Sequence, residues 1–402
     1  MRNRHLLIIF AIVLVNMLAF GIVIPLLPYL AEKTGASEFQ TGLLTAAYPL
    51  AQLLGAPLLG RLSDRYGRKP ILIVSILGTA LGFVVLGLAG SLGWLFVSRV
   101  IDGLTGGNIN VAQAYIADVS ERSERGKAMG MIGAAFGLGF VIGPVTGGLL
   151  SGISYSAPAR AGAGLALLNV LFVVLFLPES LTLEARDRLA ARKRRVFDMV
   201  ALRHAFGHAR VRPLLTIRAV TGVAFALFET MFALWAMAAL SLSAQATGVF
   251  LGYLGVLSVI VQGGLIGKLT KRYSDDGLLL MSIVVSGVCL VAWAFAPNVA
   301  VLAVVALPLS FGLAVGQTVM TSALSKAVDA DEVGGVLGVQ TSVMSLTRVV
   351  APVLGGYLLE HATTWSPGVL AGVLTLVMLP YAWRTLCLVP GRDSCAEPPH
   401  PG

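Results

Sequence analysis

The sequence GRLSDRYGRKP, at residues 60–70, interrupts two long apolar stretches with a dense group of charges. It follows TGLLTAAYPLAQLLGAPLL and precedes ILIVSILGTALGFVVLGLAG, and neither stretch contains a charged residue. Four basic residues in the segment surround one acid, Asp64. A membrane-spanning helix needs about 20 mostly apolar residues. The pattern therefore predicts two spanning helices joined by a short, positively charged loop.

The composition of the whole chain extends this prediction. Of its 402 residues, 56% are hydrophobic and only 12% are charged, whereas a soluble domain has about 25% charged residues. So few charges cannot cover a water-facing surface. Transmembrane β-barrels alternate inward and outward residues over segments of about 10, but the apolar runs here are continuous. We therefore predict an all-α, polytopic membrane protein.

Counting apolar runs between polar breaks predicts twelve transmembrane helices. Pro297 and Asn298 lie within one uncharged run that is too long for one helix, so a tight turn is expected there. The predicted spans are 6–30, 41–60, 71–90, 92–117, 127–152, 158–178, 213–240, 246–268, 277–296, 299–325, 334–359 and 366–388.

The basic residues predict the orientation of these spans. They gather in alternate loops and at both ends of the chain, while the other loops contain only Lys33 and Arg160. Because positive loops stay in the cytoplasm, both termini and the long loop at 179–212 should be cytoplasmic. The net charge of +9 then reflects topology, and we expect no nucleic-acid partner. The short loops indicate a prokaryotic inner membrane.

An internal repeat divides the chain in two. Three segments recur at a constant offset of about half the chain: GRLSDRY (60–66) with GKLTKRY (267–273), ERGKAMG (124–130) with EVGGVLG (332–338), and GPVTGGLL (143–150) with APVLGGYL (351–358). Parallel six-helix repeats characterise one class of transporter, whose substrate site lies near the membrane midplane. We predict two pseudo-symmetric six-helix bundles at 1–178 and 213–390, a linker at 179–212 and a cytoplasmic tail at 391–402.

Three motifs resemble those of the major facilitator superfamily, and within it the twelve-span drug:proton antiporters. GRLSDRYGRK is similar to the superfamily motif between the second and third spans. RVIDG (99–103) resembles a fourth-span motif, and GFVIGPVTGG (139–148) resembles the fifth-span motif of exporters. The resemblance covers essentially the whole chain. It implies a monomeric transporter that works by alternating access and uses the proton gradient without a cofactor.

The first motif is expected to act as a cytoplasmic gate. Glycines permit tight turns, so Gly60 and Gly67 should shape the loop, and Arg65 with its basic neighbours should hold it in the cytoplasm. The resemblance implies that Asp64, Arg68 and Asp118 form a charge cluster that holds the two halves together in one conformation. A purely topological role for the basic residues is the alternative.

The fifth span is rich in glycine at four-residue spacing, which lets helix backbones approach closely. Proline within a helix removes a backbone donor and favours a kink. The resemblance implies a close, bent contact between the halves that prevents ion leak, and generic tight packing is the alternative. The motif residues are Gly139, Gly143, Pro144, Gly147 and Gly148.

Ionisable residues inside a membrane are costly and mark functional sites. Arg99 and Asp102 are three residues apart on the fourth span and can therefore interact. Glu229 lies in the seventh span with no charge near it in sequence. We expect these three residues to take part in proton coupling. The alternatives are a self-neutralising pair for Arg99 and Asp102, and a permanently protonated carboxyl for Glu229.

The resemblance places the first, fourth, seventh and tenth spans around a central cavity. Aromatic side chains beside an acid suit a flat lipophilic cation, although ordinary helix packing explains them equally well. The amides are equally suited to helix–helix hydrogen bonds. Arg218 is close enough to the cytoplasmic end to extend toward the interface, and Arg348 is expected to pair with an acid. The candidate substrate-binding residues are Asn16, Asn110, Glu229, Phe232, Trp235, Gln317 and Arg348.

These features favour proton-coupled export of small lipophilic compounds or antimicrobials. Tetracycline exporters look similar over the first six spans, but the resemblance implies an Asp where this chain has Asn16. The alternatives are proton-coupled uptake of a sugar or another nutrient, and transport of lipid or another non-drug cargo. An ATP-driven pump or an enzyme is not expected, because the chain has no GxxxxGK[ST] loop and no catalytic or metal-binding constellation.

Overall fold

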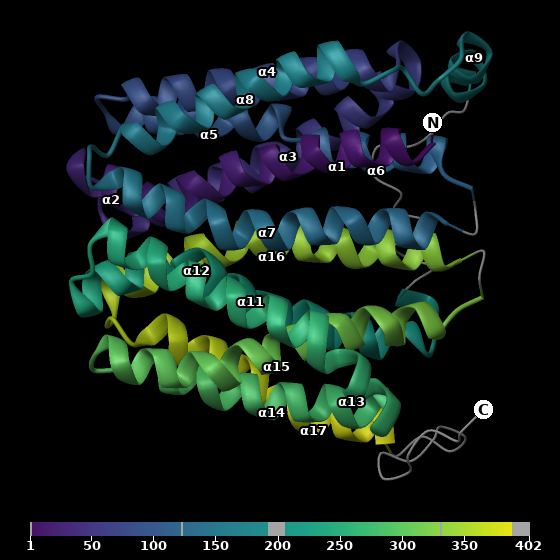
Figure 1. The fold of residues 1–402 in the computed structure, drawn as a ribbon. Helices are drawn as coiled ribbons and strands as arrows, with labels where there is room; N and C mark the ends of the chain where they lie inside the picture. Colours follow the sequence, from purple (N-terminus) through teal and green to yellow (C-terminus); the bar gives the residue numbers. More distant parts are fainter. Residues whose placement is uncertain (1, 122–123, 192–205, 330–331, 388–402) are drawn as a thin grey trace. The chain divides into compact units, whose positions relative to one another are not determined.

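The computed structural model describes residues 2–121, 124–191, 206–329 and 332–387, and every regular element within these ranges is a helix (Figure 1). The predicted all-α class is therefore confirmed. The predicted tail at 391–402 lies outside the described residues.

The elements follow one another with short connections. They are α1 (Arg2–Val23), the 3-10 helix η1 (Ile24–Leu26), α2 (Leu27–Lys33), α3 (Glu38–Tyr66), α4 (Arg68–Leu88), α5 (Leu92–Thr105), α6 (Asn108–Val119), α7 (Arg125–Ser151), α8 (Ala157–Phe176), α9 (Leu183–Ala191), α11 (Val211–Leu240), α12 (Ala244–Ile260), the π-helix η2 (Val261–Leu265), α13 (Ile266–Arg272), α14 (Asp275–Ala294), α15 (Val299–Lys326), α16 (Val333–His361) and α17 (Ser366–Cys387).

Eleven helical segments of the described chain are long and apolar enough to cross a membrane. Their ends agree with eleven of the predicted spans to within six residues. Large apolar side chains such as Leu168, Leu175 and Val304 are exposed on them, as expected of a surface that faces lipid. The sequence at 297–298 forms the expected turn, where the Asn298 side chain accepts a hydrogen bond from the Val301 N–H (3.0 Å) and begins α15.

The remaining predicted span, 92–117, corresponds to two shorter helices, α5 and α6. The chain turns between them at Gly106 and Gly107. Gln52 of α3 donates a hydrogen bond to the Gly106 carbonyl (2.7 Å), which satisfies a backbone group that the break releases. A Cβ on Gly106 would lie 2.9 Å from the Tyr48 hydroxyl, so the close approach of α3 requires glycine there.

The eighth predicted span is also irregular. Its helix changes from α12 into the π-helix η2 and returns to α-helix in α13. Such insertions are rare and are often found at functional sites. The sequence VQGGL gave no indication of this irregularity beyond its paired glycines.

Contacts divide the chain into two units. The first unit contains residues 1–196 and 242–255, and the second contains residues 197–241 and 256–402. Segment 242–255, which the predicted boundaries place in the second bundle, therefore makes its contacts with the first unit. Each unit has its own apolar core: one surrounds α1, α4 and α6, and another surrounds α11, α14 and α15. The predicted domain boundaries themselves stay a prediction.

Candidate functional site

Glu229 and Arg348 form an ion pair between two helices of the second unit. Arg348 Nε lies 3.0 Å from Glu229 Oε2, and Nη2 lies 2.9 Å from Oε1. This bidentate geometry is the strongest arrangement of a guanidinium and a carboxylate. The side chains remain 22% and 47% exposed, respectively. The carboxyl that has no charged neighbour in sequence thus has a partner 119 positions away, on α16.

Arg99 and Asp102 form the second ion pair at membrane depth, within α5 of the first unit. Arg99 Nη1 lies 3.3 Å from Asp102 Oδ2. Both side chains are buried, and Arg99 Nη2 and Asp102 Oδ2 have no hydrogen-bond partner among the described residues. Helix α4 packs closely over the pair, because a Cβ on Gly82 would lie 2.9 Å from the Asp102 Cβ. The pair is enclosed and incompletely hydrogen-bonded.

The polar amides differ in their surroundings. Asn16 Oδ1 accepts a hydrogen bond from Asn108 Nδ2 (2.9 Å), and both side chains are buried. Asn16 therefore links α1 to α6, which is the helix–helix alternative to a role in ligand binding. Asn110 is exposed on α6, and Gln317 is exposed on α15 beside a cavity that also contains Arg218.

The expectation that Phe232 and Trp235 bind substrate is not supported by their positions. Both are almost completely buried, and they pack against Trp293 of α14 with ring centroids 6.4 and 5.1 Å away. Phe228 contacts the same indole edge-to-face at 5.0 Å. These rings form an aromatic core inside the second unit, which follows the packing alternative. Their regular spacing reflects the face of α11 that packs inward.

The structure brings together the cytoplasmic cluster, which we define as Asp64, Arg68 and Asp118. Arg68 Nη1 lies 2.7 Å from Asp64 Oδ1, and Arg68 Nε lies 3.0 Å from Asp118 Oδ2. Arg68 Nη1 also donates to Ser63 Oγ at 2.7 Å. Arg68 is buried, so one guanidinium joins three helices, α3, α4 and α6. Arg65, by contrast, is exposed and lies over the Tyr66 ring at 5.3 Å.

Sequence analysis missed Glu179, which completes this region. Its two carboxylate oxygens accept hydrogen bonds from the backbone N–H groups of Arg68 (2.9 Å) and Lys69 (3.2 Å) at the start of α4. The first N–H groups of a helix lack partners within the helix and attract negative charge. Arg186 of α9 lies 3.4 Å from the same carboxylate. The signal that could have found Glu179 is an acid directly after the sixth span.

The two glycines of the first motif have different roles. Gly67 has φ +106° and ends α3, and a Cβ there would lie 2.7 Å from Arg186 Nη2. The prediction that Gly60 shapes the loop is wrong. Helix α3 continues through Gly60 to Tyr66, and no atom lies within 4 Å of a Cβ built on Gly60. One glycine suffices because the turn occupies a single residue.

The glycines of the fifth-span motif pack on α1. A Cβ on Gly143 would lie 2.7 Å from Gly21 Cα. Gly139 and Gly147 approach Met17 and Ile22 of α1 in the same way. Gly148 faces α12 instead, where a Cβ would lie 3.1 Å from Gly248 Cα.

Helix α7 is continuous from Arg125 to Ser151 despite Pro144. Three motif glycines thus bring together two helices of one unit, whereas the sequence had predicted a contact between halves. Close backbone packing of this kind depends on small residues.

Comparisons with known proteins agree with this architecture. The sequence profile described as Major Facilitator Superfamily matches residues 9–307 and 264–399. The chain belongs to the major facilitator superfamily.

Its curated relatives include resistance proteins of bacteria. Tetracycline resistance protein, class C, of Escherichia coli is 31% identical over 388 residues, which cover 94% of this chain and 96% of that protein. Multidrug resistance protein 2 of Bacillus subtilis is 28% identical and is covered to 93% by an alignment spanning 92% of this chain. Solute carrier family 22 member 18 of Mus musculus is 30% identical over 89% of this chain and 90% of that protein.

Solved structures of the superfamily share the fold at lower identity. A crystal structure of the nucleoside transporter NupG has a TM-score of 0.80 at 13% identity, with 94% of this chain and 99% of that chain covered. The inward-facing, occupied structure of a bacterial homologue of the human lysosomal transporter Spinster has a TM-score of 0.75 at 16% identity, with 96% of each chain covered. This superfamily member is therefore a multi-pass membrane protein with the fold of known transporters.

Proposed function

We propose that the protein is a proton-coupled secondary transporter of the cell inner membrane that exports small lipophilic compounds, antimicrobials among them. Tetracycline and multidrug resistance proteins are among its relatives over more than nine-tenths of the chain. The observation that carries the proposal is the Glu229–Arg348 pair, a partly exposed ion pair between α11 and α16 at membrane depth. Ionisable groups at such depth belong to ion and substrate pathways.

The geometry of this pair gives Glu229 two states. While the carboxylate is charged, both of its oxygens bind Arg348 and hold α11 against α16. Protonation removes the negative charge and one acceptor site, so the bidentate contact is lost and the two helices can separate. A cationic cargo that approaches Glu229 would displace Arg348 in the same way. Proton and cargo thus compete for one carboxylate, which is the requirement for exchange.

Asp102 has a different role in this proposal. It is buried, and its contact with Arg99 lies within one helix, so a proton can reach it only after α4 and α5 move apart. Asp102 would therefore respond to the conformational change rather than start it. The cytoplasmic cluster is an independent contact that must form and break in the cycle, since Arg68 joins α3, α4 and α6.

Proton flux in everted membrane vesicles tests the proposal. The vesicles are energised, internal pH is followed with a quenched dye, and tetracycline and lipophilic cations are added one at a time. We expect one of these additions to restore fluorescence with the wild-type protein and to have no effect with Glu229→Gln. Glu184→Gln, the same chemical change at an exposed position on α9, is the matched control and should behave as wild type. No response to any compound from folded wild-type protein would contradict drug export, and an equal response from Glu229→Gln would remove Glu229 from the proton pathway.

A further inference from the structure

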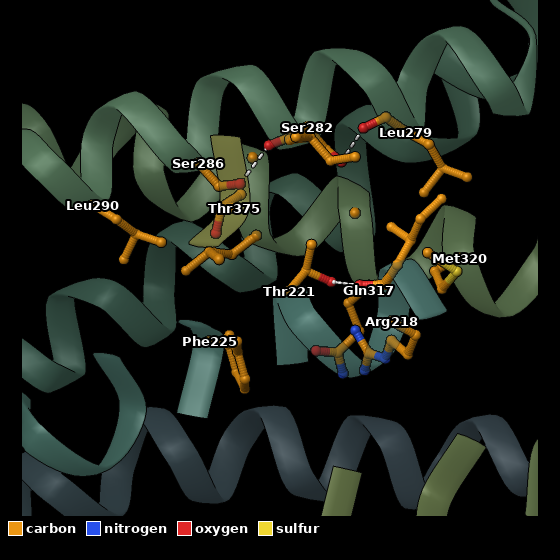
Figure 2. Close-up of a pocket in the computed structure, with 15 residues that line it drawn as sticks. Arg218, Thr221, Phe225, Leu279, Ser282, Ser286, Leu290, Gln317, Met320 and Thr375 are labelled. Carbon is orange, nitrogen blue, oxygen red and sulfur yellow. Dashed lines mark hydrogen bonds between the residues drawn. The ribbon is translucent and has the colours of Figure 1, made fainter. Parts of the chain in front are cut away.

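A small polar cavity lies within the second unit, apart from the Glu229–Arg348 pair. Helices α11, α14, α15 and α17 line it (Figure 2), and its volume is about 40 Å³. Its polar lining residues come from all four helices: Arg218 and Thr221, Ser282 and Ser286, Gln317, and Thr375.

Arg218 is the only charged residue among the fifteen that line this cavity. Its side chain is buried, and its Nε has no hydrogen-bond partner among the described residues. The expectation that Arg218 extends to the membrane interface is therefore wrong. The nearby Arg348 repels Arg218, and Glu229 is already bound to Arg348 through both carboxylate oxygens. The cavity thus contains a guanidinium whose charge no lining acid balances.

The hydroxyl groups of the cavity can provide further donors. Thr221, Ser282 and Thr375 each donate to a backbone carbonyl of their own helix, at 2.8, 2.7 and 2.8 Å respectively. A hydroxyl hydrogen can rotate to another acceptor, and a carbonyl oxygen inside a helix already accepts a backbone N–H. These side chains can therefore turn toward an anion without any movement of the helices.

The volume limits what the cavity can hold. A water molecule needs roughly 10–15 Å³ of such space, so about 40 Å³ accommodates a carboxylate group or a halide ion. A complete drug-sized molecule does not fit. The cavity is therefore suited to the charged end of a larger compound, or to a free ion.

We propose that the Arg218 cavity binds a small monovalent anion, which is either the carboxylate of an amphiphilic compound or a free halide. A buried guanidinium without a partner is unfavourable, and an anion beside it forms charge-assisted hydrogen bonds. Gln317, which is exposed and also lines the cavity, provides an amide N–H at the same place. If the anion belongs to the cargo, this inference rests on the proposed function and narrows its substrates to amphiphilic acids.

Thermal unfolding of the purified full chain tests this site without any transport measurement. The unfolding midpoint is measured in detergent and a zwitterionic buffer while sodium chloride or sodium benzoate is added. We compare wild type with Arg218→Gln and with Arg384→Gln, which removes an exposed positive charge from α17 of the same unit. We expect at least one salt to raise the midpoint of wild type and Arg384→Gln by several degrees in a saturable manner, and to raise that of Arg218→Gln by less than a quarter as much.

The two salts distinguish the sources of the anion. A response to benzoate alone identifies a carboxylate site for amphiphilic acids, and an equal response to chloride identifies a site for a free halide. No saturable response, or the same response in Arg218→Gln, overturns the proposal. Vesicles without proton flux, together with Arg218-dependent benzoate binding, would contradict the proposed function and leave this site intact.

A further variant protects the test if Arg218→Gln does not fold. Arg218→Lys keeps the positive charge but loses the planar fork that binds both oxygens of a carboxylate. We expect it to weaken benzoate binding at least fivefold while the folded state is retained. Unchanged benzoate affinity in Arg218→Lys would contradict a carboxylate held by the guanidinium.

Discussion

The two ion pairs at membrane depth differ in how they are built. Arg99 and Asp102 lie three residues apart on one helix, are buried and leave polar atoms without hydrogen bonds. Glu229 and Arg348 lie on two helices, make two hydrogen bonds at 2.9 and 3.0 Å, and are partly exposed.

The difference separates a structural charge pair from an exchangeable one. A pair within a single helix keeps its partners together whatever the bundle does, so it neutralises itself in every conformation. A pair between two helices breaks when those helices move. Exposure also lets water, protons and cargo reach Glu229 directly. The account therefore assigns the exchange of protons to Glu229 and the maintenance of the first unit to Arg99 and Asp102.

The largest effect is expected from Arg99→Gln. Removing one partner of a buried pair leaves an uncompensated charge and costs about 3 kcal/mol or more. We expect a large fall in the unfolding midpoint of the purified protein. The double variant Arg99→Gln/Asp102→Asn should recover most of the loss, because no buried charge remains. A single variant as stable as wild type would show that the pair is not enclosed.

A smaller effect is expected from Gly67→Ala, which tests whether the cytoplasmic cluster is as tightly built as the buried pair. Gly67 has φ +106°, and a Cβ there would meet Arg186. A backbone conformation of this kind costs a non-glycine residue about 1–3 kcal/mol. Gly60→Ala is the matched control: it lies in a helix with free space around it, where alanine is favoured by up to ~1 kcal/mol. Chemical or thermal unfolding of both variants should give shifts of opposite sign, and equal shifts would refute the assigned turn.

The smallest effect on stability is expected from Glu229→Gln. Partly exposed ion pairs contribute about 1 kcal/mol or less, and the glutamine retains one acceptor for Arg348. The unfolding midpoint should therefore stay within a few degrees of wild type, in contrast to Arg99→Gln. A loss of stability as large as that of Arg99→Gln would remove the distinction between the two pairs.

The sequence predicted the elements that depend on local composition. The ends of eleven spans follow from apolar runs and charged loops, and the turn at Asn298 follows from its capping side chain. The break at Gly106 was not predicted, because it depends on Gln52 reaching the carbonyl from another helix. Gly60 was misjudged because a glycine in a charged segment was taken as a turn, although the helix continues beyond it.

Within the candidate site, residue types were easier to predict than partners. Charges inside apolar runs identified Glu229, Arg348, Arg99 and Asp102, and the three-residue spacing correctly linked the last two. No local pattern could link Glu229 to Arg348 across 119 positions. The aromatic residues of α11 have the same spacing whether they face a cavity or a core, so only the packing of Trp293 decided between the two.

Proton flux from the two doubly neutralised pairs tests the central claim most directly. Everted vesicles are prepared with Glu229→Gln/Arg348→Gln and, in parallel, with Arg99→Gln/Asp102→Asn, and cargo-driven proton flux is compared at equal amounts of folded protein. The account predicts that the first double variant loses at least nine-tenths of the flux, whereas the second keeps a measurable, cargo-dependent flux. Full flux from the Glu229→Gln/Arg348→Gln protein, with none from the Arg99→Gln/Asp102→Asn protein, would contradict it.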